Sequence, residues 1–79
     1  MTLDEFETRG KEARNEAVRL LSRVEMGCRL RFSDETFSRS APGWVRVEFN
    51  RGYSNELPRG EAVSSIAFNL ASGMKYSII

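Results

Sequence analysis

The N-terminal third of the sequence constrains the fold most, because it has the spacing of one long amphipathic helix. From Leu3 to Val24 the apolar and small residues recur so that, at about 100° per residue, they fall in a single arc. Thr2 and Glu5 have the spacing of a capping box, which predicts that the helix begins here. Gly27 suits its C-terminal end, since glycine adopts the left-handed conformation without a Cβ clash.

Two shorter segments alternate apolar and polar residues, which is the pattern of a half-buried strand. In residues 28–32 the apolar side chains share one face, and Arg29 and Arg31 take the other. In residues 44–49 the face opposite the valines carries Trp44, Arg46 and Glu48. The two segments are predicted to pair as a hairpin with a long loop.

The segments between these elements are predicted to be loops. Residues 33–43 are polar and contain serine, proline and glycine, although residues 36–38 could pair briefly. Asp34 and Glu35 are two adjacent carboxylates without further ligands, so a solvated loop is favoured over a magnesium site. Residues 50–55 are predicted to be a second loop or tight turn.

A second helix is predicted to start near Pro58 and Gly60, where proline is tolerated because an early N–H has no partner within the helix. Its apolar residues share one face: Ala62, Val63, Ile66, Ala67, Leu70 and Ala71. In the middle of the first helix, the apolar face carries three small residues that project little from the backbone: Gly10, Ala13 and Ala17. They predict that another element packs closely there. Gly73 suits the end of the second helix, and residues 75–79 are predicted to form a last strand.

The predicted fold is a single α+β domain over residues 1–79, with the order α-β-β-α-β. The economical arrangement is a two-layer sandwich, in which both helices cover one face of a three-stranded, mainly antiparallel sheet. The last strand would lie antiparallel beside the first. The other face of the sheet would be exposed to water.

Size, charge and cysteine content narrow the class of protein. A chain of 79 residues that is 41% hydrophobic and 29% charged is typical of one soluble domain. Its net charge is +1, whereas most nucleic-acid-binding domains have a large excess of basic residues. Cys28 is the only cysteine, which excludes an intramolecular disulfide and favours a reducing compartment. The acidic N-terminus does not resemble a signal peptide, so a cytoplasmic protein is expected.

Composition also argues against catalysis. The sequence has no histidine, which is the commonest general base and metal ligand. Its glycines are scattered and fail both the dinucleotide and the P-loop spacings. A domain of this size has little interior for a deep substrate cavity. We therefore expect no enzymatic activity, no catalytic residues, no metal and no cofactor, and a protein that acts by binding.

Two surfaces are candidate binding sites. The first is the polar face of the two alternating strands, which carries Arg29, Arg31, Trp44, Arg46 and Glu48. Arginine and tryptophan are enriched where partners bind, although solubility and cross-strand pairing explain the same residues. The second is Phe68, which projects opposite the apolar face of the second helix. It either packs under the first helix or the Tyr53 loop, or marks a contact with a partner or a second copy.

In size, cytoplasmic character, compact α+β pattern and lack of catalytic residues, the chain resembles the small inhibitors that bacteriophages and mobile elements encode, including anti-CRISPR proteins. The resemblance is one of class and includes no motif. It implies stoichiometric binding to a CRISPR surveillance complex or nuclease in the bacterial cytoplasm, on a surface that binds nucleic acid. The partner-binding residues would be Arg29, Arg31, Trp44, Arg46, Glu48 and Phe68.

Two alternatives come from other classes. A small nucleic-acid-binding regulator would use the same arginines, with Trp44 stacking on a base. An antitoxin or assembly subunit would dimerise through Phe68. The low net charge and the many acidic residues of the first helix favour a protein partner over nucleic acid. A monomer or weak homodimer without membrane contact is expected.

Overall fold

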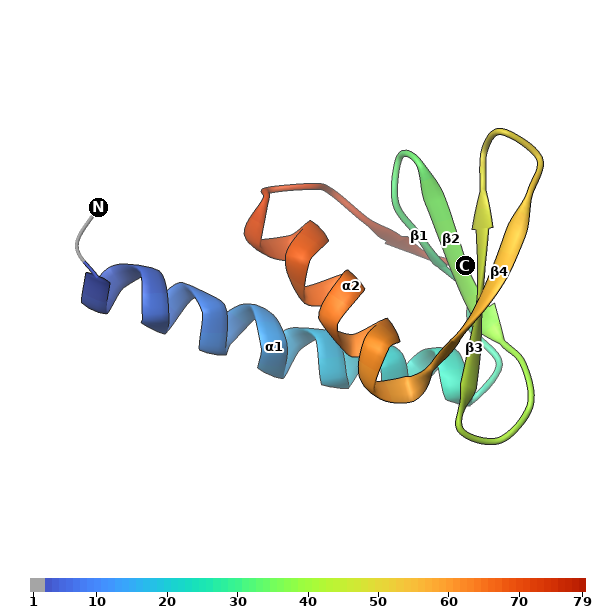
Figure 1. Ribbon diagram of the computed structural model, residues 1–79, viewed down its shortest axis with the longest axis horizontal. Coiled ribbons are helices and arrows are strands. Elements are labelled where there is room, and N and C mark those ends of the chain that lie inside the picture. The colour runs from blue at the N-terminus through green and yellow to red at the C-terminus, as the bar shows by residue number, and fades with distance from the viewer. Residues whose placement is uncertain (1–2) are drawn as a thin grey trace.

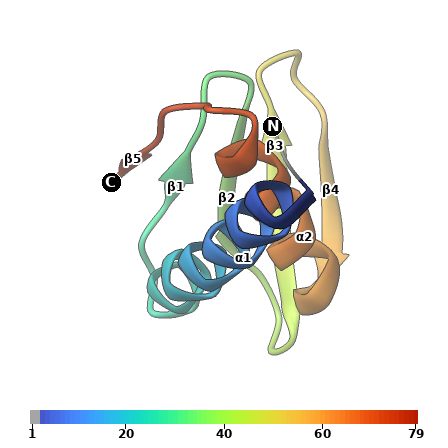
Figure 2. The ribbon, with the colours of Figure 1, turned by 90° about the vertical axis from the view of Figure 1, so that its left-hand side faces the viewer.

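The computed structural model describes residues 3–79, so the predicted cap at Thr2 lies outside the described residues. Within this range the elements follow in the order α1 (Leu3–Glu25), β1 (Leu30–Arg31), β2 (Glu35–Arg39), β3 (Trp44–Phe49), β4 (Ser54–Pro58), α2 (Arg59–Ala71) and β5 (Ser77–Ile78) (Figure 1). The strands form one antiparallel sheet in the order β4-β3-β2-β1-β5. Figure 2 shows both helices in front of the same face of this sheet. The α+β class is as predicted.

Both helices end in the same glycine-dependent arrangement. At the end of α1, the Cys28 N–H donates to the Arg23 carbonyl at 3.1 Å, and the Gly27 N–H donates to the Val24 carbonyl at 3.0 Å. Gly27 has a φ of 109°, which a residue with a Cβ rarely adopts. The end of α2 repeats the pattern at Gly73, with a φ of 83°. Both predicted helix ends are therefore confirmed.

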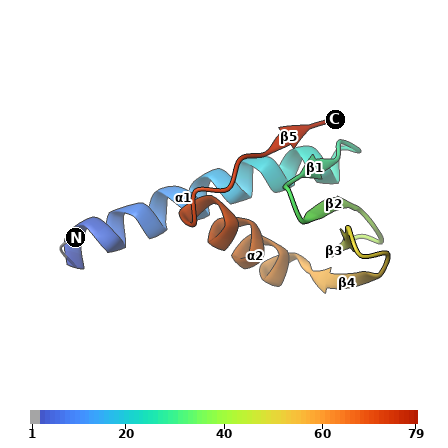
Figure 3. The same ribbon diagram turned by 90° about the horizontal axis from the view of Figure 1, so that it is seen from above.

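The core lies between the two helices and one face of the sheet. Its buried side chains are Ala17, Leu20, Leu21, Val24, Leu30, Phe32, Phe37, Val45, Val47, Ala62, Val63 and Ile66. The small residues Ala13 and Ala17 are buried where α1 packs on α2, as their size predicts. Gly10 is instead exposed, because the first turns of α1 extend past the end of α2 (Figure 3).

The predicted number and order of strands were wrong, because two strands lie in segments that the sequence analysis assigned to loops. β2 lies inside the predicted long loop, and β4 occupies the predicted turn and the approach to α2. Each has a single inward-facing apolar residue, Phe37 or Leu57, so neither shows the repeated alternation that identifies a strand. The described order is α-β-β-β-β-α-β.

The insertion of β2 also changes the strand neighbours. The predicted hairpin between residues 28–32 and 44–49 is absent from the described sheet, because β2 separates β1 from β3. The last strand does lie antiparallel beside the first, with Leu30 opposite Ile78. This part of the predicted topology is confirmed.

The two edges of the sheet offer few free backbone donors. In the β3–β4 ladder the Phe49 N–H donates to the Tyr53 carbonyl. Hydrogen-bonded and non-hydrogen-bonded pairs alternate along an antiparallel ladder, so the backbone N–H and C=O groups of Ser54, Glu56 and Pro58 point away from β3. The outward Glu56 N–H donates to Oδ1 of Asn55 at 3.0 Å, and proline has no N–H. At the other edge, β5 is only two residues long. Both features are known ways of protecting an edge strand, so the edges are poor places for a partner strand to add.

Candidate functional site

The sheet face that points away from the helices carries five of the six predicted contact residues. The four charged side chains are exposed, and Trp44 is 47% exposed: Arg29, Arg31, Trp44, Arg46 and Glu48. Successive side chains of a strand point to opposite faces of the sheet. The residues between these five, such as Leu30, Val45 and Val47, point into the core, so the five share the other face. We call this surface the open face.

The strand register fixes how these side chains are arranged. Ser38 lies opposite Arg46, and Arg46 lies opposite Glu56. Arg29 precedes Leu30, so extending the β1–β2 register by one residue places it opposite Ser38. Arg29 and Arg46 are therefore separated by two strand spacings, or about 9.5 Å. Three arginines and the two glutamates Glu48 and Glu56 give the open face a formal charge of +1. The open face thus presents separated guanidinium groups on a rigid support.

Phe68 does not belong to this surface. It lies on α2, in the helical layer, and is 70% exposed. The interpretation that Phe68 packs under the first helix or the Tyr53 loop is therefore wrong. Phe68 borders a shallow hollow of about 380 Å³ that Ser65, Asn69 and Glu35 also line.

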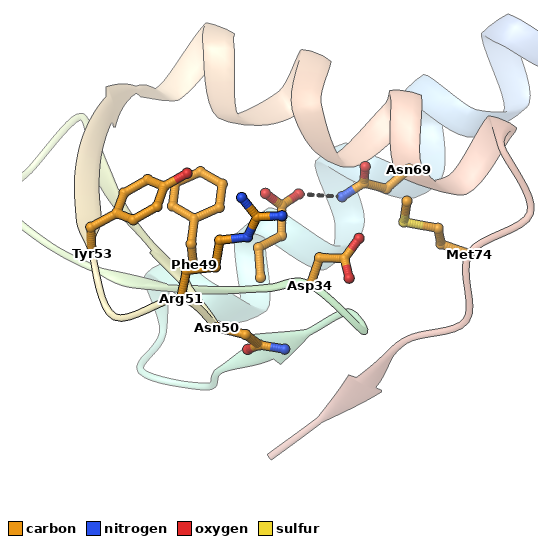
Figure 4. A pocket seen from close by; sticks show the side chains of 8 residues that line it. Asp34, Phe49, Asn50, Arg51, Tyr53, Asn69 and Met74 are labelled. Atoms are coloured by element: carbon orange, nitrogen blue, oxygen red, sulfur yellow. Dashed lines mark hydrogen bonds between the residues drawn. The ribbon is translucent and has the colours of Figure 1, made fainter.

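A second pocket, which the sequence analysis missed, continues from this hollow because Glu35 and Asn69 line both. Its volume is about 410 Å³. Three parts of the chain form it: the β1–β2 turn, the β3–β4 turn and the end of α2 (Figure 4). We call it the turn pocket. Its lining combines charged, amide and aromatic side chains: Asp34, Glu35, Phe49, Asn50, Arg51, Tyr53, Asn69 and Met74.

Asn50 holds the two turns of the pocket together. Its backbone N–H donates to the Asp34 carbonyl at 3.1 Å, and its side-chain amide donates to the Ser33 carbonyl. The β1–β2 turn is closed by a bond from the Phe32 N–H to the Glu35 carbonyl at 2.8 Å. The wall that carries the carboxylates is therefore fixed by backbone bonds.

Asn69 connects α2 to this wall. Its side chain is only 6% exposed and donates a hydrogen bond from Nδ2 to Oε1 of Glu35. A buried amide needs such a partner, because an unmade hydrogen bond in the interior costs about 1–3 kcal/mol. The sequence holds one signal for this role: Asn69 follows the buried Ile66 by three residues and so lies on the inner side of the helix.

We expect Asn50→Ala to lower the free energy of unfolding by about 1 kcal/mol, because the substitution removes the side-chain bond to the Ser33 carbonyl. In a domain of this size that loss lowers the Tm by about 4–8 °C. Circular dichroism during heating measures it. Asn15→Ala, at an exposed position on α1, is the matched control and should leave the Tm unchanged or slightly higher. Equal Tm values for Asn50→Ala and the unmodified protein would contradict the role of Asn50.

Among the side chains that the structure describes, those of residues 9–79, no group of three or more potential metal ligands lies close enough together to hold an ion. Cys28 is a half-buried free thiol. Neither described helix is both long enough and apolar enough to cross a membrane. Comparison with protein families, with curated proteins and with solved structures finds no significant match for this chain.

Proposed function

We propose that this protein is a non-catalytic binding protein that inhibits a host macromolecular complex by covering its functional surface, as anti-CRISPR proteins do. The observation that carries the proposal is the open face, where Trp44 and three arginines stand exposed on the side of the sheet away from both helices. Arginine and tryptophan are the residues in which interface binding energy concentrates. Paired strands already fix their backbone, which reduces the entropy lost on binding.

The size of the open face indicates how much of the partner it covers. The five strands contain 20 residues, which at about 3.3 Å per residue and about 4.8 Å between strands give a projected area of about 320 Å². A stable interface buries about 800 Å² on each partner. The open face therefore supplies less than half of such an interface, and we expect the contact to continue over the neighbouring turns.

Inhibition of CRISPR interference tests the proposal. The protein is expressed in a panel of bacterial strains, each with one active CRISPR system, and plasmid loss is measured against matched strains without that system. The unmodified protein should protect the plasmid in at least one strain. Trp44→Ala should weaken binding to the inhibited complex by about 30-fold or more, the effect typical of an interface hot spot.

A charge-matched pair of variants separates the open face from a general effect of charge. Arg31→Ala with Arg46→Ala should abolish protection, whereas Arg9→Ala with Arg14→Ala, on the exposed surface of α1, should retain it. Lack of protection in every strain would contradict the inhibitory function. Equal protection by both double variants would show that the open face is not the binding surface.

The second candidate is a nucleic-acid-binding regulator, which the position of Trp44 next to Arg46 on the open face favours. Such a protein retards an oligonucleotide in a gel at about 50 mM salt and loses affinity steeply as salt rises, because phosphate contacts release counterions. The proposed inhibitor should give no such retardation. Retardation that disappears in the Trp44→Ala variant would replace the inhibitor with the regulator.

A further inference from the structure

Two carboxylates from neighbouring residues, Asp34 and Glu35, line the turn pocket. Asp34 and Glu35 both belong to the turn that Asn50 holds in place, and Asn69 anchors the Glu35 side chain. Figure 4 shows the carboxyl group of Asp34 directed into the pocket, between Asn69 and the β3–β4 turn. A carboxylate that is already held, as that of Glu35 is, accepts a hydrogen bond from a cation without a large loss of side-chain entropy.

An aromatic surface forms the opposite wall. Phe49 and Tyr53 stack on each other with ring centroids 4.7 Å apart and an angle of 26° between the rings. Tyr53 is 58% exposed, so the stack leaves ring surface accessible. The face of an aromatic ring attracts cations through its quadrupole, and planar cations also stack on it.

We propose that the turn pocket binds the guanidinium group of an arginine side chain supplied by a partner protein. A guanidinium is planar and has five N–H donors, so it can stack on the aromatic wall and donate to the carboxylates together. A lysine ammonium lacks the planar surface. A phosphate is repelled by the carboxylates of Asp34 and Glu35. The pocket's volume of about 410 Å³ leaves room for such a side chain.

Arg51 is the protein's own cation in the same pocket. It lies in the β3–β4 turn, and Figure 4 shows its side chain running beside the Phe49 ring toward the pocket interior. Arg51 is exposed and can turn into solvent. With two carboxylates against one arginine, the charged lining residues have a net charge of −1. Arg51 should therefore compete with a second guanidinium, which makes it the most informative residue to change.

That the arginine comes from a surface that binds nucleic acid rests on the proposed function. Surfaces that bind nucleic acid contact phosphates with arginine and lysine. A protein that covers such a surface gains affinity if it accepts one of these arginines in a pocket. The turn pocket would supply that contact beyond the edge of the open face.

Binding is tested on the isolated protein with N-acetyl-arginine amide as the probe. Its neutral isostere, N-acetyl-citrulline amide, is the matched control. Amide NMR spectra should show saturable shifts of the Asn69 side-chain NH₂ and of the Asp34 and Asn50 backbone with the arginine probe, at a dissociation constant on the order of 1–10 mM, as expected for a ligand this small. The citrulline probe should leave these signals unchanged. No shift at about 50 mM arginine probe, or equal shifts with both probes, would overturn the inference.

Three variants of pocket residues change the affinity in opposite directions, and a fourth variant, on α1, is the control. Asp34→Asn and Glu35→Gln keep hydrogen-bond acceptors but remove a charge, and each should weaken binding about threefold or more. Glu12→Gln, on the exposed surface of α1, should change nothing. Arg51→Gln should tighten binding about twofold or more. Loss of binding in Arg51→Gln would show that Arg51 supports the probe instead of competing with it, and would overturn the inference. Because the arginine probe needs no partner, this experiment can fail while CRISPR inhibition by the open face succeeds, and the reverse.

Discussion

Phe37→Ala should lower the free energy of unfolding by about 3–5 kcal/mol, which is the usual cost of removing a buried phenylalanine. Phe37 is fully buried at the centre of β2, the middle strand of the sheet. Its ring meets Phe32 edge-on, with centroids 5.9 Å apart and an angle of 81° between the rings. A chain of 79 residues has a total stability of roughly 4–12 kcal/mol. The substitution should therefore remove at least about a quarter of the total stability.

Urea denaturation followed by circular dichroism measures this loss. Thr36→Ala is the control, because it lies next to Phe37 on the same strand but faces away from the core. It should cost less than about 1 kcal/mol, in keeping with its modest effect on strand propensity. Similar stabilities for the two variants would contradict the placement of β2 in the middle of the sheet.

Ala17→Leu should lower the free energy of unfolding by about 1–3 kcal/mol, for the opposite reason. Ala17 is fully buried where α1 packs on α2, and three additional carbon atoms have no space there. The helices have to move apart or the leucine has to take a strained rotamer. In a domain of this size, the expected loss in Tm is about 4–8 °C for each kcal/mol.

Val18→Leu provides the comparison at the adjacent position. Val18 is 38% exposed, so the added bulk can extend into water, and the Tm should stay within about 2 °C of the unmodified protein. If Ala17→Leu melts at the same temperature as Val18→Leu, the contact between α1 and α2 is looser than the buried alanine indicates.

The elements that could be predicted from sequence are those with several residues of one periodicity. α1, α2 and β3 have repeated apolar residues, and their positions agree with the prediction. β2 and β4 contribute one inward apolar residue each, and β4 contains serine, asparagine and proline, which are uncommon in strands. These two strands are held by backbone pairing with β3, the strand next to each of them in the sequence. Backbone pairing leaves no apolar pattern within the strand itself, so the residues of β2 and β4 alone do not reveal it.

The candidate sites differ in the same way. Alternation along single strands was enough to predict that Trp44, Arg46 and Glu48 share a face. The turn pocket depends on Glu35, Asn50 and Asn69, which come from three separate parts of the chain. Asp34 and Glu35 were predicted to lie in a solvated loop. No local pattern indicates that Glu35 accepts a hydrogen bond from Asn69, which lies 34 residues further along the chain. Topology, rather than propensity, creates that pocket.

The Asn55 and Pro58 side chains at the outer edge of β4 affect how much of the protein a cell can hold in solution. The proposed inhibitor would act without turnover, so it would need at least one copy for every copy of its target and would have to accumulate in the cell. Folded sheets with an unguarded margin recruit one another into fibres under such crowding. Here the outward N–H of Glu56 is occupied and Pro58 has none, which disfavours the addition of a second copy's strand at β4 as the protein accumulates.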